Sequence, residues 1–110
     1  MAEPRKKYLS PTEMLINKVG ETEARKMLRA AEIGMIVAEE IYAVRTRFHL
    51  TQKELAAKVG TTQSVIARLE DADYEGHSLS MLVRIAEALD VELVPPRFKV
   101  PKRAKVKGTG

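Results

Sequence analysis

The chain has 110 residues, of which 45% are hydrophobic, enough for one small domain with flanking arms. It contains no cysteine, which excludes a disulfide scaffold, a cysteine-based zinc site and a thiol nucleophile. The net charge of +4 is unevenly distributed along the chain. The stretch from Tyr8 to Pro96 holds ten basic and fourteen acidic residues, whereas both ends are basic. Basic ends suit phosphate contact, whereas an acidic body argues against indiscriminate coating of nucleic acid.

The two ends carry clusters of positive charge and no membrane or export segment. No apolar run approaches the roughly 18 residues of a membrane helix, and the N-terminus lacks the apolar stretch of a secretory signal. We therefore expect a cytoplasmic protein without membrane contact. The tail, residues 95–110, is expected to be disordered, and it is either merely solvated or a nonspecific DNA clamp. The basic residues at the ends are Arg5, Lys6, Lys7, Arg97, Lys99, Lys102, Arg103, Lys105 and Lys107.

The N-terminal third predicts an arm and two helices. Residues 1–10 form the arm, and a short helix opens at Pro11–Thr12, runs to about Lys18 and stops at Gly20. A long helical stretch rich in Ala, Arg, Glu and Leu follows from Glu21, with Gly34 marking a kink or a break within it. Later in that stretch, apolar residues recur at spacings of three and four and predict one buried stripe: Val37, Ile41, Val44 and Phe48.

Two short helices joined by a tight turn follow. Thr51 with Glu54 forms a capping box at the start of the first helix, and Gly60 ends that helix. Thr62 caps the second helix, which runs from Gln63 to Asp71. The residues of the first helix predicted to face inward are Leu55, Ala56 and Val59.

The rest of the body predicts an irregular turn, a helix and a short strand. The turn covers residues 71–77, and the helix from Leu79 to Leu89 is capped by Ser78 and directs Leu82, Ile85, Ala86 and Leu89 inward. The alternating segment Val91–Val94 is a candidate strand that Pro95–Pro96 would stop. We thus expect an arm with helical extension over 1–31, a domain over 32–94 and a tail over 95–110.

The second short helix presents chemistry suited to DNA. Ile66 and Leu69 fall on one side of the helix, whereas Gln63, Ser64, Ala67 and Arg68 fall on the other and Val65 lies on the flank. Glutamine can pair with adenine, arginine with guanine, and alanine or valine methyl groups can meet thymine. An ordinary amphipathic helix would also show a polar side. The preceding capped helix, the Gly60 turn and the small Ala56 favour DNA recognition.

The segment LTQKELAAKVGTTQSVIARLE, from Leu50 to Glu70, resembles the Cro/repressor-type (XRE) helix-turn-helix family, and KVGTTQS is similar to lambdoid phage repressors. The resemblance spans roughly Val37 to Val91. It implies an all-α, five-helix Cro/repressor-like DNA-binding domain, here with an N-terminal helical extension. It also implies a phosphate contact at Gln52 beside Thr51, and a structural ion pair between Arg45 and Glu70. The DNA-binding residues expected are Thr51, Gln52, Thr62, Gln63, Ser64, Val65, Ala67 and Arg68.

The N-terminal helical extension, the acidic body and the segment ARLEDADYEGHSLSMLVRIAEALDVEL together resemble HigA-type antitoxins of type II toxin–antitoxin pairs. This resemblance implies a protein that represses its own operator and binds a RelE-like toxin. We expect a homodimer because one recognition helix covers only a few base pairs, so two half-sites are needed. The alternatives are a free-standing phage, plasmid or restriction-system repressor, or a protein-binding module that does not read DNA. A set of apolar residues would form a contact face or pack the extension onto the domain: Met14, Leu15, Met27, Leu28 and Met35.

Two departures from the family concern the turn and the N-terminus. The turn after the second short helix is acidic where phage repressors place positive charge, so it points away from DNA or makes contact through Tyr74 and the backbone. The N-terminal extension is longer than a minimal repressor needs. His49 and His77 lack metal-ligand spacing, and no nucleophile–base set occurs, so we expect no metal, no cofactor and no enzyme activity.

Overall fold

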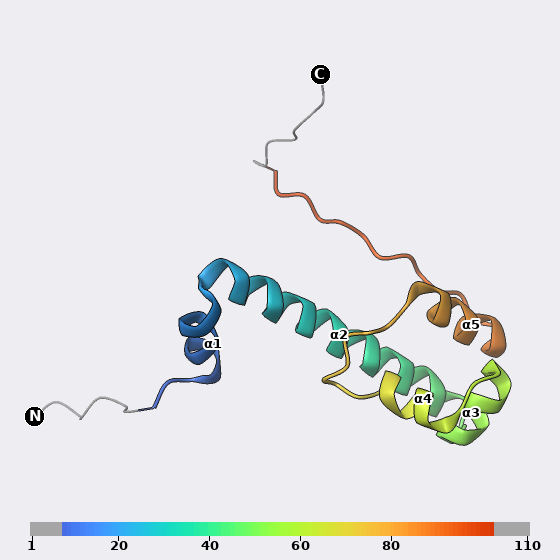
Figure 1. Cartoon of the computed structure of the whole chain (residues 1–110). Coiled ribbons are helices and arrows are strands. Elements are labelled where there is room, and N and C mark those ends of the chain that lie inside the picture. Colours follow the sequence, from blue (N-terminus) through green and yellow to red (C-terminus); the bar gives the residue numbers. More distant parts are fainter. Residues whose placement is uncertain (1–7, 103–110) are drawn as a thin grey trace, which may run out of the picture.

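The computed structural model describes residues 8–102, which form five helices and no strand, confirming the predicted all-α class. These are α1 (Pro11–Val19), α2 (Glu21–Arg47), α3 (Gln52–Val59), α4 (Gln63–Leu69) and α5 (Leu79–Leu89). Figure 1 shows α3, α4 and α5 gathered around the C-terminal half of α2, with α1 at its opposite end. The basic clusters at residues 5–7 and 103–107 lie outside the described residues.

The two N-terminal helices begin where the sequence predicts, and α1 ends at the predicted Gly20. Ser10 Oγ accepts the Glu13 amide at 3.1 Å, and the Glu13 carboxylate accepts the Ser10 amide at 3.5 Å, which completes a capping box. Pro11 occupies the first turn, where its missing N–H costs nothing. Gly20 separates α1 from α2 with a φ of 90°, a conformation that glycine adopts without steric cost.

Helix α2 runs without interruption through Gly34, so the predicted break between two helices is absent. Gly34 is buried, and a Cβ built there would stand 2.8 Å from the backbone oxygen of Tyr74. The glycine therefore gives the 71–77 loop room to lie against α2, while the helical hydrogen bonds continue around it. The sequence correctly identifies Gly34 as an unusual position within a helix. It does not reveal that the reason is the close approach of the 71–77 loop.

The predicted stripe on α2 holds for three of its four members. Ile41 is buried and Val37 and Val44 pack against the core, but Phe48 is 44% exposed. Helix α2 ends at Arg47, and the chain then turns through His49, whose φ is 57°. That turn carries Phe48 away from the helical register, and Leu50 packs against the core in its place.

The core lies where α2, α3, α4 and α5 meet. Each fully buried Leu or Ile contributes about 1.5–3 kcal/mol relative to an exposed one, so this cluster accounts for the stability of the domain. Thr51, Thr62 and Ser78 cap α3, α4 and α5 as predicted. Helix α4 ends at Leu69, two residues earlier than predicted. The buried cluster comprises Ile41, Leu55, Ala56, Val59, Ile66, Leu69, Ile85 and Leu89.

Beyond α5, the structure departs from the prediction of a strand. Asp90 ends the helix in the left-handed conformation with a φ of 53°, which a short polar side chain tolerates. Val91–Val94 is irregular, because no segment among residues 8–102 pairs with it, although Val91 packs against the core. Residues 95–102 are irregular as well. None of the helices within residues 8–102 has the length and apolarity to cross a bilayer.

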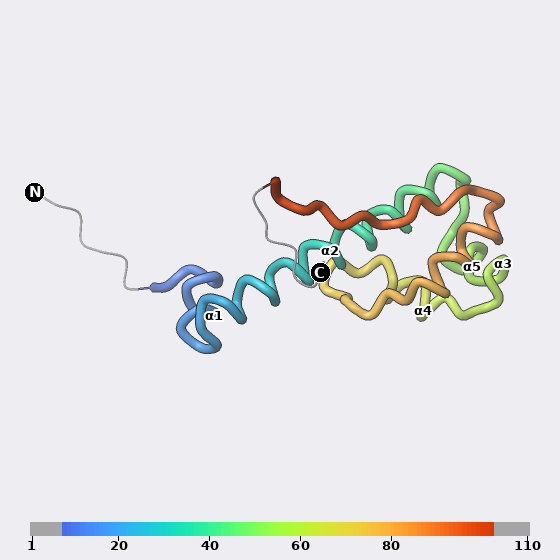
Figure 2. The backbone as a smooth tube through the Cα atoms, turned by 90° about the horizontal axis from the view of Figure 1, so that it is seen from above, coloured from blue at the N-terminus to red at the C-terminus, as the bar shows by residue number. Residues whose placement is uncertain are grey.

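The extension formed by α1 and the first half of α2 projects from the domain. The described chain has a radius of gyration of 19.4 Å, whereas a compact chain of this length would have about 13 Å. Figure 2 shows α1 well separated from α3, α4 and α5. Of the five apolar residues predicted to form a contact face or to pack the extension onto the domain, Leu15 is half-buried. The other four are exposed and do not pack the extension onto the domain: Met14, Met27, Leu28 and Met35. The boundary expected at residues 31 and 32 falls inside α2.

Candidate nucleic-acid interface

Helices α3 and α4 are joined by a three-residue turn that fixes the angle between them. Gly60 adopts the left-handed conformation with a φ of 83°, and its amide and that of Thr61 both donate to Ala56 O at 2.9 Å. Leu55 and Ile66 are fully buried where the two helices cross. Because Ala56 has only a methyl group, the turn folds back closely on α3, and α4 is held with one face outward.

The residues predicted to contact DNA lie on the outer side of this pair. Six of them are exposed, and Gln52 and Val65 are half-buried. The exposed face of α4 carries amide, hydroxyl, methyl and guanidinium groups and no carboxylate. Its chemistry is therefore compatible with a polyanion, and its donors can meet base edges. The six exposed residues are Thr51, Thr62, Gln63, Ser64, Ala67 and Arg68.

A chain of hydrogen bonds links the start of α4 to the buried side of the domain. Gln63 Nε2 donates to Gln52 Oε1 at 3.4 Å, and Gln52 Nε2 donates to Glu70 Oε1 at 3.2 Å. The Glu70 carboxylate in turn accepts two hydrogen bonds from Arg45. The first residues of α3 and α4 therefore belong to one hydrogen-bond network that ends at the Arg45–Glu70 pair.

Arg45 and Glu70 form the ion pair that the family resemblance implies. Arg45 Nε lies 2.6 Å and Nη2 lies 2.9 Å from the two carboxylate oxygens, and the side chains are only 12% and 5% exposed. Arg45 Nη1 also donates to Leu50 O at 2.8 Å. The hydrogen bond to Glu70 raises the pKa of Arg45 against the opposing effect of burial. The bidentate geometry ties α2, the 48–51 turn and the end of α4 together.

The capping box of α3 places a second ordered group at the same surface. Thr51 Oγ1 accepts the Glu54 amide at 3.0 Å, and Glu54 Oε1 accepts the Thr51 amide at 2.8 Å. These hydrogen bonds from Thr51 lower the pKa of Glu54. With Gln52 next in the chain, the N-terminal end of α3 faces outward, where free amides and the helix dipole favour an anion.

The acidic 71–77 turn is engaged with the protein itself. Tyr74 packs against the core, its hydroxyl donates to Gly76 O at 3.1 Å, and its backbone lies against Gly34. His77 Nε2 lies 2.7 Å from Leu69 O, the last residue of α4, and its ring meets Tyr74 edge to face. The structure thus uses Tyr74 internally. His77, which the sequence leaves without a role, holds the end of α4.

Arg84 is a second residue whose role is not evident from the sequence. Its Nη2 donates to Val59 O at 3.0 Å and Gly60 O at 3.2 Å, so α5 satisfies the carbonyls at the end of α3. The partners are 25 and 24 residues apart in sequence, and no local pattern connects them. Among residues 8–102, no group of three His, Cys, Asp or Glu side chains is placed to hold a metal ion.

Comparisons with known proteins agree with this geometry. The helix-turn-helix family matches residues 41–95, half of the chain. The chain is also similar to an uncharacterized HTH-type transcriptional regulator, y4dL, of Sinorhizobium fredii (strain NBRC 101917 / NGR234), at 38% identity over 58 residues. That match covers 53% of this chain and 29% of the relative, so the chain spans less than a third of the relative's length. No solved structure matches this chain significantly.

Proposed function

The chain belongs to the helix-turn-helix family, and from this membership we propose that it is a sequence-specific DNA-binding transcriptional regulator that acts as a homodimer. The observation that carries the proposal is the outward face of α4, which is free of carboxylates and whose first residue, Gln63, is held by Gln52. A single helix covers only a few base pairs, so two half-sites bound by a two-fold dimer supply useful affinity.

In this proposal α4 lies in the major groove. Gln63 pairs with adenine and Arg68 with guanine, each through two hydrogen bonds to the base edge. Ser64 offers its hydroxyl to either, while Val65 and Ala67 place methyl groups against thymine. The Gln52–Gln63 hydrogen bond limits the conformations of the Gln63 amide, so less conformational entropy is lost when it meets a base.

The same proposal assigns the phosphate contacts to the start of each helix. Gln52 and Thr51 meet a phosphate at the N-terminal end of α3, where the helix dipole is favourable, and Thr62 does so at the start of α4. These contacts position the protein on the duplex without reading sequence. Their loss should weaken binding to all sequences alike, whereas loss of a base contact should act at one position.

The test is DNA binding by purified variants, measured by fluorescence anisotropy against a site selected from random duplexes by the parent protein. Gln63→Ala and Arg68→Ala should each lose about 1–3 kcal/mol of discrimination at particular base pairs. Thermal stability should be unchanged because both side chains are exposed. Arg25→Ala, which removes an exposed arginine from the extension, is the control. Parent-like specificity in both α4 variants would reject this role for α4.

We propose further that the regulator is the antitoxin of a type II toxin–antitoxin pair, repressing its own operon and binding a RelE-like toxin. Two features support this: the acidic balance of the body, which complements a basic partner, and the methionine-containing apolar surface of α1 and the start of α2. Met14 on α1 and Met27 on α2 are exposed, and flexible thioether side chains adapt to a partner's surface.

The antitoxin role is tested with the product of the reading frame adjacent to the gene for this chain. Expression of that product alone should arrest growth, and co-expression of this chain should restore it. Met14→Lys should reduce the rescue without altering operator binding, while Lys18→Ala, on the same helix, should not. If the neighbouring product does not arrest growth, or if Met14→Lys rescues growth as well as the parent does, the antitoxin role is rejected and a free-standing repressor is favoured.

A further inference from the structure

Helix α2 carries large apolar side chains that no other part of the described chain covers. Leu28, Met35 and Tyr42 are 41%, 41% and 54% exposed. They recur every seven residues, so they lie along one side of the helix, and we call them the outer stripe. Ala31 and Ala38 fall between them and are less exposed, so the three large side chains project as separate knobs.

The exposed apolar area on α2 is large for a surface facing only water. Five large apolar side chains on the stripe or beside it together expose on the order of 500 Å², which matches the largest patch usual on a monomer. A stable dimer buries about 800 Å² from each partner, and neighbouring polar atoms can supply the remainder. The five are Met27, Leu28, Met35, Ile36 and Tyr42.

We propose that a second copy of this chain packs antiparallel along the outer stripe, with the two-fold axis at Met35. This rests on the proposed function, because the required position of the two domains selects the arrangement. The symmetry places Met35 against Met35 of the second copy and Leu28 against its Tyr42. Each large side chain of the stripe then has an apolar partner.

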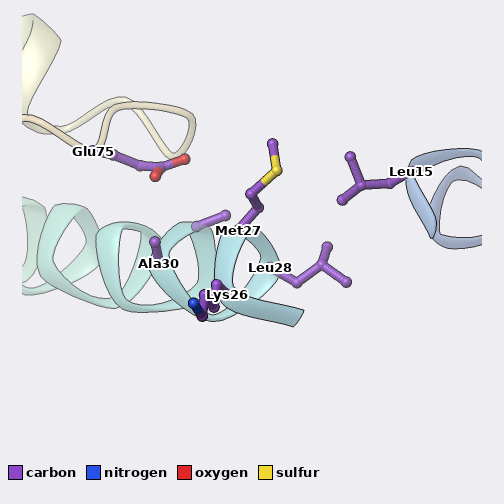
Figure 3. A pocket seen from close by; sticks show the side chains of 7 residues that line it. Leu15, Lys26, Met27, Leu28, Ala30 and Glu75 are labelled. Carbon is purple, nitrogen blue, oxygen red and sulfur yellow. The ribbon is translucent and has the colours of Figure 1, made fainter. Parts of the chain in front are cut away.

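The surroundings of Leu28 contain space for an incoming tyrosine. An open hollow of about 420 Å³ lies between α1, α2 and the 71–77 loop, lined by Leu15, Met27, Leu28 and Ala31 among others. Figure 3 shows Leu15 and Met27 projecting toward the same space and Glu75 on the loop opposite. Lys26 and Glu75 also line it. A tyrosine inserted beside Leu28 would thus find apolar walls for its ring and polar groups for its hydroxyl.

The antiparallel direction follows from the position of the domains. Arg45, which holds the end of α4, is ten residues from Met35, or about 15 Å along the helix. Two copies therefore place these points about 30 Å apart, and α4 extends outward from there, near the 34–36 Å between half-sites one turn of DNA apart. Parallel α2 helices, about 8–10 Å apart, would instead carry the two domains to opposite sides of the helix pair, where the two α4 helices could not meet one face of a duplex.

Both domains also fall on one side of the helix pair. Three of the four buried residues of α2, Gly34, Ala38 and Ile41, lie about a quarter turn from the outer stripe at 3.6 residues per turn. The two-fold axis of an antiparallel pair runs perpendicular to the plane of the two helices. It therefore carries each domain to the same side, where both α4 helices can meet one face of a duplex.

The first test is the mass of the full chain by analytical ultracentrifugation at micromolar concentration. The parent should sediment at about twice 12.3 kDa, and Met35→Glu should weaken self-association at least 100-fold by placing two carboxylates at the two-fold. Ile33→Glu is the matched control, since Ile33 is 54% exposed on the same helix but nearly half a turn away. Circular dichroism checks that both variants fold. A monomeric parent, or equal effects of the two variants, would overturn the proposal.

Cysteine crosslinking then fixes the direction, because the chain has no cysteine of its own. Under mild oxidation Met35→Cys should form a covalent dimer. Leu28→Cys should link to Tyr42→Cys in a mixture but not to itself, whereas a parallel pair would give the reverse. If the parent instead purifies with a basic protein that Met35→Glu releases, the stripe belongs to that partner and the proposal is rejected.

The two proposals fail separately in these experiments. If Met35→Glu is monomeric but still prefers the selected half-site, the function and the dimer surface both stand. If the parent is a dimer but binds DNA without sequence preference, the dimer surface is supported and the proposed function is rejected. If the parent is a monomer that binds its site specifically, the proposed function is supported and the dimer surface is rejected.

Discussion

The domain around α3 and α4 and the extension around α1 use similar local devices with different tertiary results. Each contains a capping box and an ion pair involving α2. In the domain these devices border a buried cluster, whereas in α1 no residue is buried. We therefore expect a cap or an ion pair beside a buried core to stabilise the fold more than the same device on an exposed helix. The extension therefore depends on α2 and, in our proposal, on a second copy.

The largest contrast is expected between the two ion pairs. Arg45→Ala should cost about 3–5 kcal/mol, because Glu70 would remain as a buried carboxylate without its partner. Arg25→Ala should cost less than about 0.5 kcal/mol, since Arg25 and Glu21, 2.8 Å apart, are 78% and 65% exposed. Urea denaturation of both variants measures the difference. Equal midpoints would show that the Arg45–Glu70 pair does not stabilise the domain.

A smaller effect is expected where the loop meets α2. Gly34→Ala should destabilise the protein by about 1–3 kcal/mol, because its Cβ would press on the Tyr74 backbone. Helix propensity alone predicts a gain of about 1 kcal/mol for this change, so the two explanations differ in sign. Thermal unfolding distinguishes them, and a raised melting temperature would mean that the loop moves aside freely.

The two capping boxes should differ as the two ion pairs do. Thr51→Ala should lower the global free energy of unfolding by about 1 kcal/mol, because α3 carries Leu55 and Val59 into the core. Ser10→Ala removes an equivalent cap from α1 and should leave global unfolding unchanged. Amide hydrogen exchange should then show faster exchange within α1 only. A loss of global stability in Ser10→Ala would show that α1 unfolds together with the domain.

The smallest effect expected is a pH dependence carried by Glu54. Its pKa is lowered by the hydrogen bonds from Thr51, so the folded state binds this proton less readily than the unfolded state. The corresponding stability is present above the ordinary glutamate pKa and is lost as pH falls through the lowered value. In Glu54→Gln the free energy of unfolding should fall less steeply as the pH is lowered through the acid range. If the fall is unchanged, other carboxylates cause the pH dependence.

Local sequence patterns were enough to predict the five helices and most of their ends. Ser10, Thr51, Thr62 and Ser78 cap their helices by hydrogen bonds that span three residues, and such contacts depend only on near neighbours. The residues of α3 and α5 that face the core were likewise predicted from their helical spacing. The candidate site could be located for the same reason, since the outward face of α4 is the complement of Ile66 and Leu69.

Other features were decided only by tertiary contact. The Arg84 bond to Val59, the His77 bond to Leu69 and the Tyr74 contact at Gly34 join segments that no local period relates. Phe48 left the predicted stripe because the turn at His49 carried Leu50 into its place, and Val91–Val94 formed no strand because a strand needs a partner. The sequence by itself determined which faces are apolar and where helices start. The tertiary structure decided which of those faces are buried, because burial depends on segments distant in the chain.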